Sequence, residues 1–484
     1  MRKRKAGGLL RASVTAVSVA GAVASMTVAN ASAAVLKPCE GADITGQGAS
    51  VANIAFAGVW GPRFNTSPNQ YACNGTQGSG EKPTVGYDPT SSVIGQASWG
   101  ALGGPGYFGA SNAYIATDEP PNAAEKDEIE RYDEARGNPA STEPESLWTI
   151  PVTAESIAVL VHLPQDCEAN SKAAPGRLVL DNITLERIFA GEIRYWNEIT
   201  EDGDKVSGGP ECLSRTRIVP IVRHERAGST DIFKKYLGLV YTDSLPFEAY
   251  PTMVDGERTC ASALPAGELE TWDSTSEGCQ SQRWPEFADV TRASTAGDDG
   301  EVAAVASTAS SIGYAGLADA RGNAAFGYDA GAGEPHKSTF WVELQHGGST
   351  KKPKYADPSV NGEKATIANA NCSKTVFTDG GNRIPTSARE TWNGVTTRVT
   401  EKNYTLCGVI YVLYVQRWCF YEGAGRTEAT ADTAWGFIEF IRQVKDEGGQ
   451  TLIAGHDYTP KFLAEEFHPI EPIPEPSLAC PPPP

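Results

Sequence analysis

The chain is 484 residues long and acidic, with 60 Asp and Glu residues against 41 Lys and Arg residues. A surface of this charge repels nucleic acid and anionic lipid, so we expect no nucleic-acid partner. A small anion is still compatible with it, because buried local dipoles outweigh a distant and salt-screened net charge. The length, together with 50 Gly and 32 Pro residues, predicts two or more domains with many loops.

The first 33 residues are typical of an export signal. Basic residues at positions 2–5 precede an apolar stretch that ends in a small-residue site at 31–33. A membrane anchor is the alternative, but Ser and Thr residues interrupt the apolar stretch. Cys39 follows Leu-Lys-Pro, which does not resemble a lipoprotein cleavage box. We therefore expect an exported protein of the cell envelope, periplasmic or secreted, without a lipid anchor.

Strand-like and helix-like segments alternate along the chain, which predicts an α/β architecture. A helix after residue 180 is expected to be capped near Asp181 or Thr184. The other expected elements are strands that run into small-residue turns and helices within 42–60, 83–98 and 311–320, a strand within 113–121, a long β segment at 149–164, a buried strand within 404–416, and an amphipathic helix at 433–449 that ends at Gly448.

Ten cysteines in an exported chain indicate disulfide bonds. The sequence does not fix their pairing, but Cys260–Cys279 and Cys167–Cys212 are candidates because each pair brackets a polar, loop-like segment. No pair has the CxxC spacing of a metal site, and the six histidines show no HExxH or His-x-His spacing. We therefore expect no metal and no cofactor.

Residues 218–237 are the most informative stretch. An apolar run that predicts a buried strand ends at Arg223, and a Gly-Ser-Thr turn at 228–230 then opens a helical pattern. The first N–H groups of a helix lack partners and lie at the positive end of its dipole, so this turn is suited to hold an anion. Arg223 can add a two-pronged contact, and Glu225 can hold its guanidinium in place. The alternative is an ordinary capped helix beside a surface ion pair.

Three other turns have a similar position. Ser50, Ser92 and Asp118 each lie where an expected strand ends, as the turn at 228–229 does. In open α/β sheets the ligand crevice lies beyond the carboxyl ends of the strands, so these residues are expected to converge on one site. The alternative role of both serines is turn capping, and that of Asp118 is a cap before Pro120.

A family resemblance rests on the order of several segments. They are TGQGAS (45–50), YDPTSS (87–92), IATDEPP (115–121), LVLDNITLERIFAGEIRYWNEIT (178–200), VRHERAGST (222–230), GDDGEVAAVASTASSIGYAGLADA (297–320) and HDYTPKFLAEEF (456–467). Together they resemble the phosphate-binding proteins of bacterial phosphate ABC transporters, the PstS family of extracytoplasmic solute-binding proteins. Each segment is weak alone, but their shared order extends over most of the chain.

The resemblance implies a two-lobed α/β fold of the periplasmic-binding-protein type (type II), with the ligand in the interdomain cleft. It implies a monomer that binds inorganic phosphate and delivers it to the membrane permease of an ABC transporter, and a binding protein rather than an enzyme. The implied division is 1–33 signal peptide, 34–155 first part of lobe 1, 156–322 lobe 2, 323–467 second part of lobe 1, and 468–484 Pro-rich tail.

Carried over to this chain, the resemblance implies a phosphate site of N–H and hydroxyl donors with one cation and one acid. Its ligand residues would be Ala49, Ser50, Ser92, Asp118, Arg223, Gly228, Ser229 and Thr230, with Glu225 orienting Arg223. Three positions depart from the family pattern, namely Val51, Ser91 and Ala227. Ala227 replaces a serine, so one hydroxyl is lost unless Thr230 or a backbone N–H compensates. Asn112 is an alternative to the family's acid, but only Asp118 keeps the acid-x-Pro order.

The acid bears on which oxyanion would bind. Phosphate near neutral pH carries one or two protons, whereas sulfate carries none, so a buried Asp118 could accept a hydrogen bond from phosphate and would repel sulfate. Binding of sulfate or molybdate is an alternative. So are an exported phosphoesterase and a surface protein, although the sequence has no GxSxG nucleophile elbow. His224 is the candidate catalytic residue of the enzyme alternative.

Overall fold

The computed structural model describes the chain in segments between residues 37 and 462. The export signal, the Cys260–Cys279 pair and the Pro-rich tail lie outside the described residues. The described residues are 37–38, 41–66, 78–79, 83–101, 112–135, 147–169, 171, 177–201, 204–205, 207–208, 212, 214–244, 272, 284–285, 288–293, 295–327, 338–349, 352–360, 362, 367–372, 387–390, 392, 403–415, 427–444 and 448–462.

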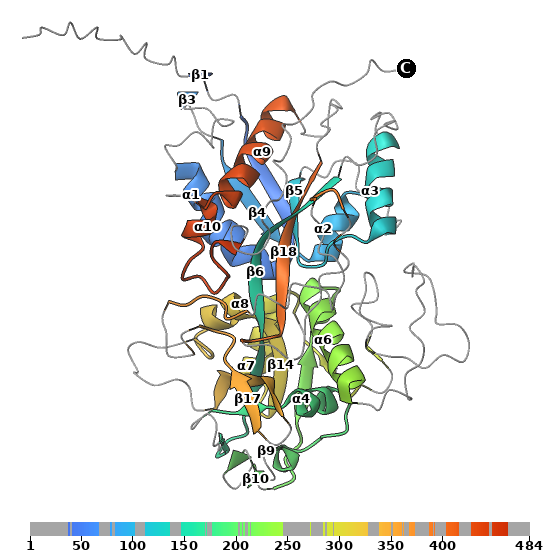
Figure 1. Cartoon of the computed structure of the whole chain (residues 1–484), viewed down its shortest axis with the longest axis vertical. Helices are drawn as coiled ribbons and strands as arrows, with labels where there is room; N and C mark the ends of the chain where they lie inside the picture. The colour runs from blue at the N-terminus through green and yellow to red at the C-terminus, as the bar shows by residue number, and fades with distance from the viewer. Residues whose placement is uncertain are drawn as a thin grey trace, which may run out of the picture. The chain divides into compact units, whose positions relative to one another are not determined.

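Nine strands of the described chain form one mixed sheet (Figure 1). In pairing order they are β13 (Thr291–Arg292), β12 (Val219–Val222), β14 (Ser311–Gly316), β6 (Leu147–His162), β18 (Cys407–Val415), β5 (Asn112–Thr117), β2 (Ile44–Gly48) and β4 (Val85–Pro89), with β15 (Thr339–Trp341) also paired to β6. Strands β2, β4 and β5 are parallel, as are β12, β13 and β14, whereas β6 and β18 are antiparallel to their neighbours. The predicted α/β class is confirmed.

The helices follow these strands along the chain. They are the 3-10 turn η1 (Ser50–Ala52), the π-helical segment η2 (Ile54–Trp60), α1 (Gly61–Thr66), α2 (Ser92–Ser98), α3 (Ala123–Ala135), α4 (Asn182–Phe189), the 3-10 turn η5 (Trp196–Glu198), α6 (Gly228–Ser244), α7 (Asp298–Ser307), α8 (Leu317–Gly322), α9 (Glu428–Arg442) and α10 (Gly449–Leu452). No described helix combines the length and the apolar character that crossing a membrane requires.

Smaller sheets complete the described strands. They are the pair β1 (Lys37–Pro38) and β3 (Gly78–Ser79), the pair β7 (Glu168–Ala169) and β11 (Ser207–Gly208), the pair β9 (Thr200–Glu201) and β10 (Asp204–Lys205), and the three strands β8 (Val179–Leu180), β16 (Glu343–Ser349) and β17 (Lys352–Ala356).

Strand β6 joins two halves of the main sheet. Its residues 147–156 pair with β18, and its residues 157–162 pair with β14, so its partner changes between Ser156 and Ile157. We call the half that contains β2, β4 and β5 the first half, and the half that contains β12, β13 and β14 the second half. Strand β6 is buried along nearly its whole length, which explains why its sequence is a continuous β-rich run without polar alternation.

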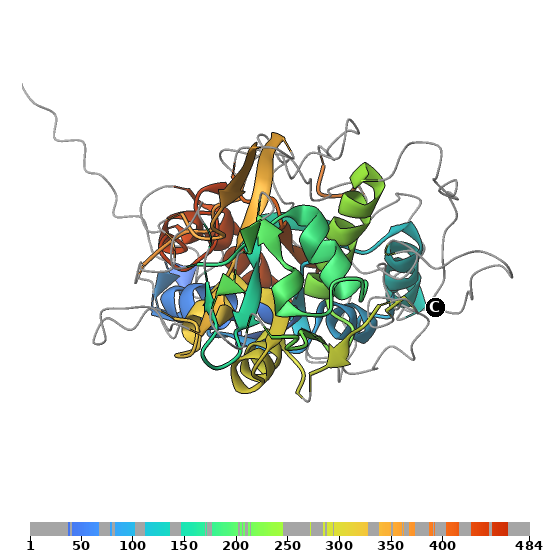
Figure 2. The same cartoon turned by 90° about the horizontal axis from the view of Figure 1, so that it is seen from below.

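Helices cover both faces of the second half (Figures 1 and 2). Val159 and Val161 of β6 share a core with α4 and α6, whereas Ala158 and Leu160 pack with α7 and α8. Successive side chains of a strand point to opposite faces. Helices α4 and α6 therefore lie on one face of the second half, and α7 and α8 lie on the other.

An aromatic cluster fixes one face of the first half. Phe56 of η2 stacks with Tyr114 of β5 at a ring-centroid distance of 5.7 Å and meets Phe437 of α9 edge-on at 6.2 Å. Tyr87 of β4 stacks on the same Phe56 ring at 5.1 Å. Burying such rings contributes roughly 1.5–3 kcal/mol each. The cluster thereby holds the strands and turns that carry the candidate site in a fixed arrangement.

Two helix predictions had different outcomes. Of the two predicted cap positions of α4, Asp181 rather than Thr184 is the N-cap residue, but its side chain makes no capping hydrogen bond. Its Oδ1 accepts from Tyr355 Oη at 2.5 Å. The prediction that the late amphipathic helix ends at Gly448 was wrong, because α9 ends at Arg442. Gln443 has extended backbone angles (φ −67°, ψ 129°), and its carbonyl accepts the N–H of Gln450 at 3.0 Å instead of continuing the helix. Gly448 precedes the separate helix α10.

Two disulfide bonds link described cysteines. Cys167–Cys212 confirms one of the two candidate pairs. Cys372–Cys407 is a pair that the sequence analysis did not single out. Its residues are separated by 35 positions, and Cys407 is the first residue of β18.

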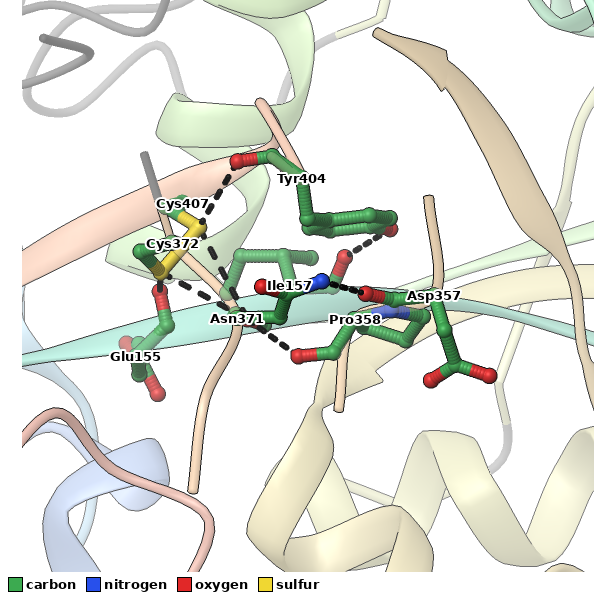
Figure 3. Close-up of a disulfide and its surroundings, with 9 residues drawn as sticks. Glu155, Ile157, Asp357, Pro358, Asn371, Cys372, Tyr404 and Cys407 are labelled. Carbon is green, nitrogen blue, oxygen red and sulfur yellow. Dashed lines mark hydrogen bonds between the residues drawn. A yellow bond between two sulfur atoms is a disulfide. The ribbon is translucent and has the colours of Figure 1, made fainter. Parts of the chain in front are cut away.

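The Cys372–Cys407 disulfide lies beside the point at which β6 changes partner (Figure 3). Cys372 Sγ is 3.2 Å from the carbonyl oxygen of Glu155. Tyr404, three residues before Cys407, donates through its Oη to the carbonyl of Ile157 at 2.7 Å. The disulfide therefore fastens a neighbouring segment to the strand that joins the two halves.

Strands β15 to β17 lie with the second half. Strand β15 pairs with residues 160–162 of β6, and β16 pairs with β8. These strands belong to residues 339–356, which the sequence analysis assigned to the second part of lobe 1. The chain then pairs with the first half through β18. The lobe boundaries themselves stay a prediction.

Candidate anion-binding site

Three of the predicted ligand residues lie at the carboxyl edge of the first half. Ser50 begins η1 just after β2, Ser92 is the first residue of α2 after β4, and Asp118 directly follows β5. These strands are parallel neighbours, so their carboxyl ends meet at one edge of the sheet. All three side chains are buried.

Ser92 and Asp118 form a hydrogen-bonded pair. Ser92 Oγ donates to Asp118 Oδ1 and accepts from the Asp118 N–H at 3.2 Å. The cap of α2 is instead Ser91, whose Oγ accepts the N–H of Ile94 at 3.2 Å. The capping alternative therefore describes Ser91, and the Ser92 hydroxyl is directed toward the acid.

The environment of Asp118 shifts its pKa toward neutral pH. Burial raises the pKa of Asp118 from 3.8 to about 7, against the lowering effect of the hydrogen bond from Ser92. The charge of Asp298 contributes to this rise, and that of Arg223 opposes it. A carboxyl group with this pKa can accept or donate a hydrogen bond near neutral pH. It suits a ligand that itself carries a proton.

Arg223 directly follows β12 and is completely buried. Its Nε and Nη2 donate to Glu225 Oε1, with Nε at 2.7 Å. Nη2 also donates to Ser50 Oγ at 3.1 Å, and Nη1 donates to Ser229 Oγ at 3.1 Å. The guanidinium therefore connects the turn after β2, in the first half, with the start of α6, in the second half.

Both members of the Arg223–Glu225 pair favour their charged forms. Burial alone would lower the pKa of Arg223, but the carboxylates of Asp298 and Glu225 raise it above its usual value. Burial alone would raise the pKa of Glu225, but Arg223 and the N–H of Gly297, which donates at 2.9 Å, lower it. Glu225 thus has the position that an orienting residue requires.

The start of α6 lies against Asp118. A Cβ atom at Gly228, the first residue of this helix, would lie 1.9 Å from Asp118 Oδ1, so a side chain there would displace the acid. Ser229 is buried and accepts from Arg223, whereas Thr230 Oγ1 lies 2.6 Å from Tyr314 Oη on β14. Gly228 and Ser229 therefore lie among the other predicted residues, and the Thr230 hydroxyl contacts Tyr314.

Two further candidates are engaged within the first half. The N–H of Ala49 donates to the carbonyl of Ala116 at 2.8 Å, so the sheet uses this donor. Asn112 begins β5, and its Nδ2 donates to Gln47 Oε1 at 2.9 Å. It is separated from Asp118 by the length of the strand, about 20 Å at 3.3 Å per residue. This placement favours Asp118 over Asn112.

Asp298, the first residue of α7, is not among the residues predicted from the sequence. Its side chain is completely buried, and its Oδ2 accepts from Ser50 Oγ at 2.6 Å and from Arg223 Nη1 at 2.5 Å. Its Oδ1 accepts the N–H of Gly316 at 3.2 Å. Helix α7 follows a short strand and a glycine, Gly297, so the strand-turn-helix reasoning that selected Ser50 could have found it.

Three more acids lie within the electrostatic reach of Arg223. They are Glu155 on β6, Glu301 on α7 and Asp319 on α8. Burial raises the pKa of each carboxyl well above its usual value, and the charge of Asp298 adds to each rise. Burial therefore disfavours the charged form of each of these three groups.

The described residues contain no cluster of His, Cys, Asp and Glu that could hold a metal ion. His224 is half exposed, and its Nδ1 lies 3.2 Å from Glu225 Oε2. The arrangement offers one guanidinium, several hydroxyl groups and carboxyl groups that can hold a proton. Such a set of donors and acceptors is chemically suited to a small oxyanion.

A mixed sheet in two halves, with polar turns from both halves meeting at its strand ends, defines the class of two-lobed α/β ligand-binding proteins. The sequence profile of the PBP superfamily domain matches residues 115–443, which is more than half of the chain. The chain belongs to the PBP superfamily. No curated protein matches the chain in sequence.

Solved structures of phosphate-binding proteins have a similar fold. One is a high affinity periplasmic phosphate-binding protein (PfluDING) bound with phosphate at pH 8.5, with a TM-score of 0.51 and 15% identity over 86% of this chain and 90% of that chain. Another is a human phosphate binding apolipoprotein, with a TM-score of 0.50 and 16% identity over 86% of this chain and 91% of that chain. These similarities confirm the predicted two-lobed fold.

Proposed function

We propose that this protein binds inorganic phosphate outside the cytoplasm and delivers it to the membrane permease of an ABC transporter. The proposal rests on one observation, which is that polar groups from both halves converge. Buried Arg223 contacts Ser50 and Ser229, and the start of α6 at Gly228 lies against the Ser92–Asp118 pair. Arg223 supplies the charge and the hydroxyl groups supply neutral donors. Asp118 supplies an acceptor for a proton on the ligand.

Asp118 is the reason for proposing phosphate before sulfate. With a pKa of about 7, it can share a proton with monohydrogen or dihydrogen phosphate. Sulfate brings no proton, so an ionised Asp118 would face a second anion in a buried site. Such an unpaired buried contact costs roughly 1–3 kcal/mol, or about tenfold to a hundredfold in affinity.

Location and partner follow from other features. Disulfides such as Cys167–Cys212 persist in oxidising compartments, which supports a site of action outside the cytoplasm. The fold similarity to a periplasmic phosphate-binding protein supports the same location. The permease partner is supported by the ordered sequence resemblance to the PstS family. In this role the protein acts as a monomer that captures and releases its ligand without turnover.

The test is calorimetric titration of residues 34–484 with phosphate, sulfate and molybdate at pH 7. We expect saturable binding of phosphate, weaker binding of the other anions, and a smaller preference for phosphate over sulfate in Asp118→Asn. Ser92→Ala should weaken phosphate binding about tenfold. Its matched control is Ser91→Ala, which removes the α2 cap at a cost of about 1 kcal/mol in stability but spares the site.

The proposal fails if phosphate produces no binding signal at millimolar concentration. It also fails if sulfate or molybdate binds more tightly than phosphate. Incubation with a phosphate ester separates binding from catalysis, because sustained release of phosphate from the ester would indicate an enzyme.

A further inference from the structure

Arg223 has all five of its N–H donors engaged within the protein. Nε donates to Glu225, and the two hydrogens of Nη2 are directed to Glu225 and Ser50. The two hydrogens of Nη1 are directed to Ser229 and Asp298. An oxyanion can therefore bond this guanidinium only if one of these acceptors gives way.

Among these acceptors, Asp298 makes the contacts that an oxygen of a bound phosphate would be expected to make. A single carboxylate oxygen, Oδ2, accepts from both Arg223 Nη1 and Ser50 Oγ, two of the groups expected to hold phosphate. The second oxygen, Oδ1, is held by the N–H of Gly316. Glu225, by contrast, grips the Nε side of the guanidinium, on the opposite side from Nη1. The carboxylate of Asp298 thus stands where an oxyanion oxygen would have to bind.

We propose that Asp298 is an internal anion that competes with the ligand for Arg223 and Ser50 and so sets the affinity of the site. This inference rests on the proposed phosphate-binding function. For a phosphate oxygen to reach these two donors, Asp298 Oδ2 must leave them, and the two anions then remain near each other in a buried environment. Both effects reduce affinity relative to the same site with a neutral residue at position 298.

Asp298→Asn tests the inference with little change in shape. The single amide oxygen of asparagine can still accept from Ser50 and Arg223 in place of Oδ2, whereas its NH2 group then replaces Oδ1 opposite the N–H of Gly316. The side chain carries no charge. The matched control is Asp299→Asn, which removes an exposed charge from the next position of α7, where Asp299 Oδ1 accepts the N–H of Gly300. Calorimetry with inorganic phosphate should show affinity at least about tenfold higher for Asp298→Asn, about 1.4 kcal/mol of binding free energy. Asp299→Asn should change affinity less than about twofold.

The outcomes separate this inference from the proposed function. If the unmodified chain and Asp298→Asn bind phosphate equally well, the inference is overturned and phosphate binding stands. If only Asp298→Asn binds, competition by Asp298 is supported, but phosphate binding as the function of the unmodified chain is overturned. If neither binds, both ideas are overturned. Circular dichroism verifies the fold of each variant, and should Asp298→Asn not fold, Asp298→Ser carries the same expectation and the same refutation.

Discussion

Replacing Arg223 with alanine is expected to destabilise the protein strongly, in addition to removing the cation of the site. The side chains of Arg223 and Asp298 are 0% and 1% exposed, and that of Glu225 is 12% exposed. Removing one partner of a buried ion pair costs about 3–5 kcal/mol, because the remaining charge is left uncompensated in a medium of low dielectric. Most of this loss should come from Asp298, since water can reach part of Glu225.

A double-mutant cycle on unfolding by denaturant measures this coupling. The four proteins are the unmodified chain, Arg223→Ala, Asp298→Asn and the double variant. Because Asn leaves no charge to compensate, the double variant should be more stable than the sum of the two single effects predicts, by about 1–3 kcal/mol. Strictly additive losses would refute the reasoning. Since alanine perturbs stability, Arg223→Lys is the better probe of binding, because it keeps a charge beside Asp298 and loses the planar fork.

Three further perturbations follow from the geometry. Burial raises the folded-state pKa of Asp118 from 3.8 to about 7, so the stability that this group contributes falls as pH rises between these values. Asp118→Asn should therefore flatten the pH dependence of the unfolding free energy by up to about 1.4 kcal/mol per pH unit between pH 5 and 7. Denaturation at a series of pH values measures this, and an unchanged pH dependence would contradict it. Gly228→Ala should weaken phosphate binding, measured by calorimetry, at least about tenfold, because the added Cβ would collide with Asp118. The control is Gly322→Ala, whose Cβ would meet nothing within 4 Å. Equal affinities of the two variants would contradict the clash. Replacing Cys372 and Cys407 together with serine should cost about 3–4 kcal/mol of unfolding free energy through the entropy of the 35-residue loop, and a loss below about 1 kcal/mol would contradict that account.

The strand ends of the site could be predicted because their signals are local. Ser50, Ser92 and Asp118 each follow a short apolar run, and a general rule about the carboxyl ends of parallel strands predicts that such positions converge. Asp298 follows a similar turn, but its contact with Ser50 joins residues 248 positions apart. Its role depends on how the second half packs, which no local pattern specifies. The contact of Thr230 with Tyr314 depends on the same packing.

Two other differences also depend on tertiary contacts. Glycine is a residue type that commonly ends a helix, which favoured Gly448. Helix α9 ends earlier, at Arg442, because Gln443 adopts an extended conformation. The disulfide between Cys372 and Cys407 could not be chosen among the possible pairings of ten cysteines, since spacing alone does not select one. In both cases tertiary contacts decide between alternatives that the sequence leaves nearly equal.

The position of Asp298 also links ligand exchange to the two halves of the sheet. Ser50 belongs to the first half, whereas Arg223 and Asp298 belong to the second, so the Ser50–Asp298 and Ser50–Arg223 hydrogen bonds connect the halves. A phosphate ion that displaced Asp298 would take over this connection with its own oxygens. A ligand shifts the equilibrium between an open and a closed arrangement of the halves only by its difference in affinity for the two. An internal carboxylate that already bridges the halves therefore reduces the additional closure that phosphate can cause. A neutral asparagine at position 298 accepts weaker hydrogen bonds from Ser50 and Arg223 than the carboxylate does. Asp298→Asn should therefore increase both the affinity for phosphate and the difference in compactness between the protein with and without phosphate, which small-angle scattering can measure; an unchanged difference would contradict this link.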